Sequence, residues 1–295
     1  MSILITGARG AVARNLASLL SARGIAHRLG SRAPDTPGTV RCDLSDPATF
    51  PEALAGVRSV FLYAEASGVD AFVEEAAAAG VEHVVLLSSS AVLAPAAVDN
   101  PLAAAHRDVE EALLASPLRT TLLRPGSFAS NALGWAGPLQ AGLPVRLPYP
   151  GAHTDPVHEV DLAEAAYAVL TDPALAGRAY TLTGPQSLSF ADQLSLLGRA
   201  LGRPVPYETV TAEQWKAEAA ASIPASFADA LLAHWAAADG VPARLTEDVP
   251  QLTGHPARSF GAWVEDHADA FRSGDWGNTE GPGPLARTGA SGKGE

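Results

Sequence analysis

Residues 3–13 read ILITGARGAVA, a short apolar run that leads into a glycine-containing loop and then into a helical pattern. Gly7 permits a tight turn, and Gly10 lets the backbone approach a pyrophosphate closely. The following helix would direct free N–H groups and the positive end of its dipole at that phosphate. The third position of the loop pattern is Ala13, which still allows close packing of helix on strand. A glycine-rich turn without a ligand would look similar, but the order of strand, loop and helix favours a dinucleotide-binding loop.

The alternation of β-rich runs and helical patterns continues along the first half of the chain. The β-rich runs are residues 3–6, 26–29, 39–42, 59–63, 83–87 and 119–123, and helical patterns start at Val12 and recur at 69–79, 102–115 and 160–170. Such alternation is typical of βαβ units and a parallel sheet. The sequence therefore predicts an α/β fold in which residues 1–127 form a Rossmann-type, doubly wound parallel sheet.

The second half of the chain is less regular, and we expect residues 128–272 to form a smaller C-terminal substrate lobe. It contains a β-rich run at 178–183 and helical patterns at 190–201, 212–221 and 225–238. Some of its strands are expected to return to the sheet. Residues 273–295 are rich in Gly, Pro, Ser and Thr, so they offer too little apolar surface to offset their ordering entropy. We expect a disordered tail there.

The composition argues against several classes of protein. A chain of 295 residues with 47% hydrophobic content can bury a sizeable core. A net charge of −12 would repel a nucleic acid, and no apolar run approaches the roughly 20 residues that span a membrane. Cys42 has no disulfide partner, and no secretion-type segment is apparent. We therefore expect a cytoplasmic protein, monomeric or homodimeric, that acts on a small molecule.

The residue at the end of the second strand indicates which dinucleotide binds. In proteins that bind NAD, an Asp or Glu there accepts hydrogen bonds from the ribose hydroxyls. That strand ends in Gly30-Ser31-Arg32, and the first carboxylate, Asp35, lies beyond a proline. The guanidinium groups of Arg32 and Arg9 can bind a 2′-phosphate, which favours NADP(H), although two solvated surface arginines would give the same sequence. Asp43 closes the third strand, where it would contact the adenine or cap a helix.

The other positions predicted to contact the cofactor lie at the carboxyl end of a strand or at the start of the first helix, where doubly wound sheets bind their ligands. They are Ala11, Val12, Leu44, Tyr63, Ala64, Ser88, Pro125 and Phe128. Farther along, Leu133, Trp135 and Leu147 would line an apolar substrate pocket together with Phe128, or would pack in an ordinary core.

Several stretches resemble the NmrA-like atypical short-chain dehydrogenases. They are residues 5–10 (ITGARG), 86–90 (LLSSS), 122–128 (LLRPGSF) with Asn131, 160–163 (VDLA), 182–185 (LTGP) and 252–260 (LTGHPARSF). The relatives in this family include quinone reductases, dye reductases, reductases of iminium intermediates, and regulators that bind NADP without turning it over. The resemblance therefore implies the fold and the dinucleotide more strongly than the substrate.

Short-chain dehydrogenases usually supply a proton from a Tyr that has a Lys four residues later, and this chain lacks the pair. No lysine precedes Lys216, and no tyrosine has a lysine at the fourth following position. The corresponding helix carries His106 and Glu110 on one face. His106 would donate a proton or hold the nicotinamide ribose, since an ordinary histidine pKa of about 6.5 suits either role. The alternative is a surface histidine paired with Glu110. Ser90 lies where sugar-epimerase relatives keep a catalytic hydroxyl, or it is an ordinary loop serine.

Other kinds of site have no support. His153, Asp155, His158 and Asp161 are close in sequence, but strand alternation places residues 155 and 158 on opposite faces and no partner cluster follows, so we predict no metal. The chain has no Gly-x-Ser-x-Gly motif, and no histidine is near Cys42 in the sequence, so covalent hydrolysis is not predicted.

These observations predict an NADPH-dependent reductase that passes hydride to a small electron-poor quinone, enone or iminium substrate. The alternatives are a regulatory protein that senses NADP(H) and a non-redox cyclase or isomerase on the same fold. The arginine-rich, lysine-poor composition is associated with high-GC bacteria, in which such reductases often serve specialised metabolism.

Overall fold

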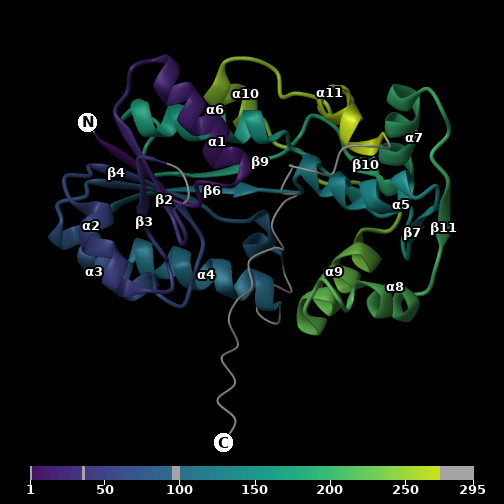
Figure 1. Ribbon diagram of the computed structural model, residues 1–295, viewed down its shortest axis with the longest axis horizontal. Coiled ribbons are helices and arrows are strands. Elements are labelled where there is room, and N and C mark those ends of the chain that lie inside the picture. Colours follow the sequence, from purple (N-terminus) through teal and green to yellow (C-terminus); the bar gives the residue numbers. More distant parts are fainter. Residues whose placement is uncertain (1, 35–36, 95–99, 273–295) are drawn as a thin grey trace, which may run out of the picture.

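A central sheet of seven parallel strands organises the computed structural model, which describes residues 2–34, 37–94 and 100–272. The strand order is β3-β2-β1-β4-β5-β6-β9 (Figure 1). The strands are β1 (Ile3–Ile5), β2 (His27–Ser31), β3 (Thr39–Arg41), β4 (Ser59–Tyr63), β5 (His83–Leu87), β6 (Arg119–Pro125) and β9 (Ala179–Leu182). The order reverses direction between β1 and β4, which is the switch point at which doubly wound sheets open a ligand crevice.

Helices cover both faces of this sheet, as Figure 1 shows. One face packs against α1 (Ala11–Ala22), α6 (Glu159–Thr171) and α10 (Asp248–Thr253), and the other against α2 (Phe50–Leu54), α3 (Val69–Ala78) and α4 (Pro101–Leu114). Strand alternation separates the two cores, because Ile3 and Ile5 belong to the first and Leu4 to the second. All three side chains are fully buried.

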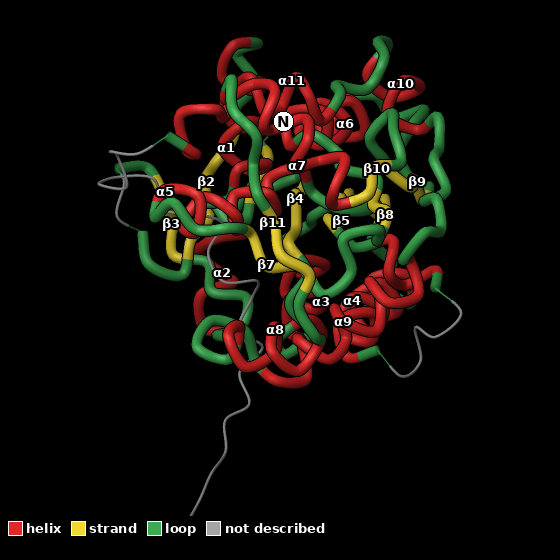
Figure 2. Tube along the Cα trace, turned by 90° about the vertical axis from the view of Figure 1, so that its right-hand side faces the viewer, coloured by secondary structure: helices red, strands yellow, loops and turns green. Residues whose placement is uncertain are grey.

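A smaller lobe with its own apolar core lies at one end of the sheet (Figure 2). Its longer helices are α7 (Phe190–Leu201), α8 (Ala212–Ala219), α9 (Ala225–Ala238) and α11 (Phe260–His267). Its short elements are η3 (Ala129–Trp135), α5 (Ala136–Gln140), β7 (Val145–Leu147), β8 (His153–Thr154), β10 (Leu188–Ser189), β11 (Tyr207–Thr209) and η4 (Ala268–Phe271). β10 pairs with β8, and β11 pairs with β7. α9 contacts both α4 and β8, so the lobe reaches across the carboxyl edge of the sheet.

The structure confirms the predicted doubly wound α/β fold, and the helices at 190–201 and 225–238 have the predicted bounds. The predicted strand at 26–29 is in fact displaced to β2, so Ser31 is still within the sheet. Sequence reasoning missed the two-stranded sheets of the lobe, because strands of two or three residues carry too little periodicity. The predicted tail, residues 273–295, lies outside the described residues. Within the described part of the chain no helix is both long and apolar enough to cross a membrane.

Candidate functional site

The glycine loop between β1 and α1 lies at the carboxyl edge of the sheet and leads into a helix end without a side-chain cap. Gly7 has a φ of +63°, which only glycine adopts readily, and Gly10 N–H donates to the Gly7 carbonyl at 2.8 Å. Ala8 N–H donates to the Gly30 carbonyl at 3.1 Å and so anchors the loop to β2. α1 starts at Ala11 with no side-chain cap and no acidic residue in its first turn. The predicted phosphate-binding helix end is therefore open to an anion.

Tyr63 packs beneath this loop and explains why both glycines lack a side chain. A Cβ at Gly7 would lie 2.7 Å from the Tyr63 ring, and a Cβ at Gly10 would lie 2.5 Å from the Tyr63 hydroxyl oxygen. Burial raises the pKa of Tyr63 to about 12, an effect that a backbone hydrogen bond with Ala13 only partly offsets. The phenol therefore stays protonated. The structure places Tyr63 as a support of the loop, on the side of the apolar core.

The two arginines predicted to bind a 2′-phosphate are exposed at the loop, and their role remains a prediction. Arg32 directly follows β2, and Arg9 lies in the loop itself. Neither guanidinium has a hydrogen bond or an ion pair with any other described residue. No carboxylate occupies the described end of β2, where Ser31 Oγ instead donates to the Ala33 carbonyl at 3.2 Å. Unpaired cations beside an open helix end fit a phosphate-bearing dinucleotide, because both attract the same anion.

A hollow lies next to the positions predicted to contact the adenine, and Leu44 lines it whereas Asp43 does not. The hollow is lined by Leu44, Leu62, Glu65, Gly68, Val69 and Phe72. Asp43 accepts the backbone N–H of Ser45 at 3.1 Å and its hydroxyl at 2.7 Å. The alternative that Asp43 caps a helix is wrong, because Asp46 is the N-cap of the following turn, η1 (Pro47–Thr49). Ala64, after β4, is partly buried against the second apolar core.

The chemical end of the site, at the ends of β5 and β6, is built around a buried ion pair. Glu110 of α4 is 4% exposed and receives two hydrogen bonds from Arg124 of β6. Ser88, after β5, donates to the same carboxylate at 2.5 Å. The interpretation of Glu110 as a surface partner of His106 is therefore wrong. Charged residues within an apolar strand and on the inner face of a helix were the sequence signal for this pair.

His106 lies one helical turn from Glu110, towards the start of α4. Burial lowers the pKa of His106 below its ordinary value of 6.5, and the Glu110 charge offsets this only in part. Its Nδ1 atom is buried without a hydrogen-bond partner among the described residues. The imidazole is therefore neutral at neutral pH, which corrects the expectation of an ordinary pKa. The buried Nδ1 atom is free to bind a ligand atom.

Ser90 begins the short turn η2 (Ser90–Leu93), next to the end of β5. It is half-buried, and its hydroxyl has no partner within the described ranges. The neighbouring Ser89 caps the turn by accepting the Ala91 N–H at 3.2 Å. The capping role thus belongs to Ser89, which leaves the Ser90 hydroxyl available to a substrate oxygen.

The segment after β6 carries Pro125 and Phe128, both predicted to contact the cofactor. Pro125 is buried, and Phe128 is half-buried and pairs with Val157. Ser127 N–H donates to Asp155 at 2.9 Å. Asp155 was considered only as a metal ligand from sequence. Leu147 belongs to the core of the lobe, where Trp135 also packs, so core packing accounts for these two predicted pocket residues.

The four residues weighed as a metal site have separate partners. His153 contacts Ser187, Asp155 contacts Ser127, and His158 caps α6 by accepting the Val160 N–H. Asp161 accepts both the backbone and the side chain of Arg258. No metal site forms from this set.

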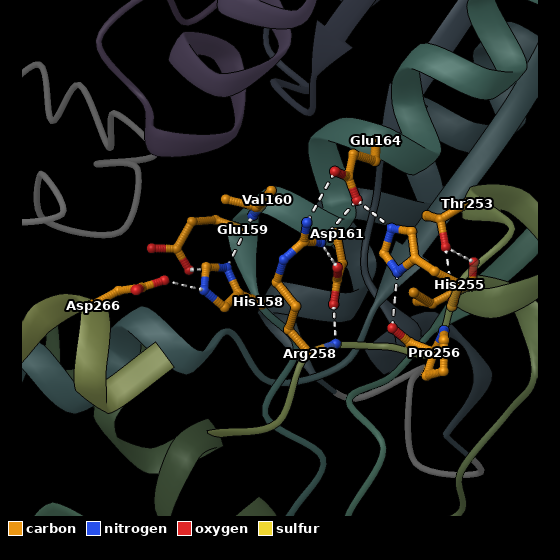
Figure 3. Close-up of polar contacts among 11 residues, drawn as sticks. His158, Glu159, Val160, Asp161, Glu164, Thr253, His255, Pro256, Arg258 and Asp266 are labelled. Carbon is orange, nitrogen blue, oxygen red and sulfur yellow. Dashed lines mark hydrogen bonds and ion pairs between the residues drawn. The ribbon is translucent and has the colours of Figure 1, made fainter. Parts of the chain in front are cut away.

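A different group, Asp161, Glu164 and His255, has ligand atoms close enough to share an ion. Figure 3 shows the Arg258 guanidinium between the two carboxylates, with hydrogen bonds of 2.8 and 3.0 Å to Glu164. His255 Nε2 lies 2.8 Å from Glu164. Arg258 already neutralises these carboxylates. The cluster instead ties the segment before α11 to α6.

Comparisons with known proteins agree with this geometry. Residues 7–173 match a family model described as NAD(P)H-binding. The chain is 36% identical over 280 residues to (4-alkanoyl-5-oxo-2,5-dihydrofuran-3-yl)methyl phosphate reductase from Streptomyces griseus, covering 91% of this chain and 99% of the relative. It is 33% identical over 242 residues to NAD(P)H azoreductase from Xenophilus azovorans, covering 79% and 83%.

Solved structures show the same fold. The triphenylmethane reductase of Citrobacter sp. in complex with NADP(H) superposes with a TM-score of 0.75 at 22% identity, covering 91% of this chain and all of that one. The glycine loop, the open end of α1 and the matches over more than half of the chain lead to one conclusion. The chain belongs to the NAD(P)H-binding family of NmrA-like, atypical short-chain dehydrogenases and is an NAD(P)H-dependent oxidoreductase.

Proposed function

We propose that this protein is an NADPH-dependent reductase of small electron-poor acceptors such as conjugated enones, quinones or iminium ions. The observation that carries the proposal is the neutralised chemical end of the site. The Glu110 carboxylate already accepts hydrogen bonds from Arg124 and Ser88, and the Tyr/Lys pair is missing from the sequence. An acceptor that delocalises the arriving charge, or already carries a positive charge, needs the least proton assistance.

The cofactor preference rests on Arg9 and Arg32, which would bind the 2′-phosphate of NADPH. Bound NADPH supplies the hydride from C4 of its nicotinamide. The Gly7–Gly10 loop and the first amides of α1 would hold the pyrophosphate, and the 126–128 segment would face the nicotinamide.

Two side chains are proposed to contact the acceptor. The Ser90 hydroxyl would donate to a substrate oxygen. His106 would hold the nicotinamide ribose as the neutral imidazole or, in its minor protonated form, supply a proton. The name of the Streptomyces griseus relative describes a ring alkene that is conjugated to an oxo and an alkanoyl group, which is an electron-poor acceptor of this kind. The arginine-rich, lysine-poor composition of the chain supports a place in bacterial specialised metabolism.

The test is single-turnover hydride transfer at saturating NADPH to an enone and to an iminium ion, followed by absorbance at 340 nm. His106→Ala and Ser90→Ala should slow the reduction of the enone more than that of the iminium ion. Only the enone develops negative charge on an oxygen and must gain a proton. His27→Ala, at the opposite edge of the sheet, is the matched control. Equal losses on both acceptors would leave His106 with a cofactor-holding role only.

Absence of hydride transfer to any acceptor, with NADPH binding intact, would reject the reductase proposal. It would favour an NADP(H) sensor or a non-redox enzyme on the same fold.

A further inference from the structure

The segment that follows β6 rests on the side chain of Asp155. One carboxylate oxygen accepts the Ser127 N–H at 2.9 Å. A Cβ at Gly126 would lie only 2.0 to 2.4 Å from the three carboxyl atoms of Asp155. The carboxylate therefore occupies the space that a side chain at position 126 would need.

Asp155 is itself fixed in place by backbone contacts. Its carbonyl accepts the Gly184 N–H at 3.1 Å, and Gly184 follows β9. A Cβ at Gly184 would lie 1.9 Å from the Pro156 carbonyl oxygen. In addition, Val157 N–H donates to the Ser127 carbonyl at 2.8 Å. Asp155 is thus wedged between the chain segments that leave β6 and β9.

The carboxylate is retained at an energetic cost. Burial raises the pKa of Asp155 to about 6, and the hydrogen bond from Ser127 offsets only part of this effect. No charged side chain of the described residues contributes to the shift. Burying a charge costs free energy unless the charge is both paired and hydrogen-bonded, and Asp155 has only the hydrogen bond. The placement of Asp155 against Gly126 therefore calls for an explanation beyond packing.

The position of the supported segment supplies this explanation. β6 lies beside β5, and Ser88 N–H donates to the Leu123 carbonyl at 2.7 Å. The 126–128 segment therefore leaves the sheet next to the turn that carries Ser90. We propose that Asp155 is a positioning residue. It holds the backbone of residues 126–128 in the position in which this segment contacts the nicotinamide end of the cofactor. This inference rests on the proposed function.

The experiment compares Asp155→Ala with Asp155→Asn, since asparagine keeps the size and the acceptor oxygen. Asp172→Asn is the control, because Asp172 also accepts a backbone N–H, from Ala174 at 2.9 Å, but is exposed beyond the far end of α6. NADPH is titrated into each variant. Its Kd, the fluorescence anisotropy of the bound nicotinamide, and the single-turnover rate of quinone reduction at saturating NADPH are measured.

In Asp155→Ala we expect hydride transfer to slow about 10- to 100-fold and the anisotropy to fall, while the NADPH Kd changes little, because misplacement affects only the nicotinamide end. Asp155→Asn should restore both readouts, and the control should match the wild type. The proposal would be overturned if Asp155→Ala lost NADPH affinity, hydride-transfer rate and thermal stability together. It would also be overturned if the anisotropy and the rate of Asp155→Ala were unchanged, or if Asp155→Asn did not restore them. If the wild type transfers no hydride, the proposed function fails, and the anisotropy still decides the role of Asp155.

Discussion

The two ends of the cofactor site are built on opposite electrostatic principles. At the glycine loop, the Ala11 and Val12 amides and the guanidinium groups of Arg9 and Arg32 have no acceptor among the described residues. At the ends of β5 and β6, Glu110, Arg124 and Ser88 satisfy one another, whereas the buried Nδ1 atom of His106 has no partner within the described part of the chain.

Under the proposed function, the phosphates of the cofactor bind at the glycine loop, and hydride transfer takes place at the ends of β5 and β6. An open cationic loop gains most from an incoming anion, because the charges there are not yet neutralised. At the ends of β5 and β6, the charged groups are buried and neutralise one another, so they hold the backbone in place but are poor proton donors. Under the proposed function, the site therefore depends on an acceptor that needs little proton assistance.

The largest effect is expected from Glu110→Ala. The variant leaves the Arg124 side chain, 18% exposed, without its counter-charge. Removing one partner of a buried ion pair costs about 3–5 kcal/mol, so the free energy of unfolding should fall by an amount of this order. Urea unfolding measures it, and Glu111→Ala on the exposed side of α4 is the control. A loss no larger than that of the control would show that the chemical end is not held by this pair.

Arg32→Ala tests the open end. Each charge-assisted contact contributes about 1.5–3 kcal/mol, so the affinity for NADPH should fall roughly 10- to 150-fold. The affinity for NADH should stay the same, because NADH lacks the 2′-phosphate. Calorimetric titration of both cofactors measures this, with Arg23→Ala near the far end of α1 as the control. Equal affinity of the wild type for the two cofactors would refute the assignment to NADPH.

Most of the open end could be predicted from sequence, because it is local. A strand, two glycines and the start of a helix lie within eleven residues, and their chemistry is carried by backbone groups. The absence of an acid after β2 was equally visible. The doubly wound sheet followed from the alternation of elements, which depends on short-range periodicity.

The chemical end could not be predicted in the same way, because its contacts are long-range. Ser88, Glu110 and Arg124 come from three separate elements, and spacing along α4 suggested the wrong partner for Glu110. The pKa of His106 depends on burial by distant segments and has no local signal. The contacts of Asp155 with Ser127 and Gly126 had no sequence signal either, since these residues are about 30 positions away in the sequence.

The pH dependence of enone reduction sharpens the role of His106. Burial places the pKa of its imidazole below 6.5, so the protonated donor form is the minor one at neutral pH. If His106 supplies the proton, the single-turnover rate should rise as the pH falls through this lowered pKa. His106→Gln should abolish the rise, with a loss of about 100-fold at the acidic end. An identical profile in the variant would assign the proton to another donor.

The smallest effect is expected from Gly10→Ala, which distinguishes two reasons why position 10 is a glycine. A Cβ there would lie 2.5 Å from the Tyr63 hydroxyl oxygen, but the same position is also proposed to approach the pyrophosphate. Gly10→Ala should therefore lower both stability and NADPH affinity. In a Tyr63→Phe background the closest contact is gone, so the stability loss should shrink by about 0.5–1 kcal/mol, within the usual range of coupling between neighbours. A double-mutant cycle on urea unfolding and NADPH titration measures both quantities, and Tyr63→Phe alone is the reference. If stability recovers but NADPH affinity does not, the loop needs glycine for the cofactor as well as for Tyr63. If both recover, Tyr63 alone accounts for Gly10, and the open end of the site owes its phosphate affinity to the α1 amides and the two arginines.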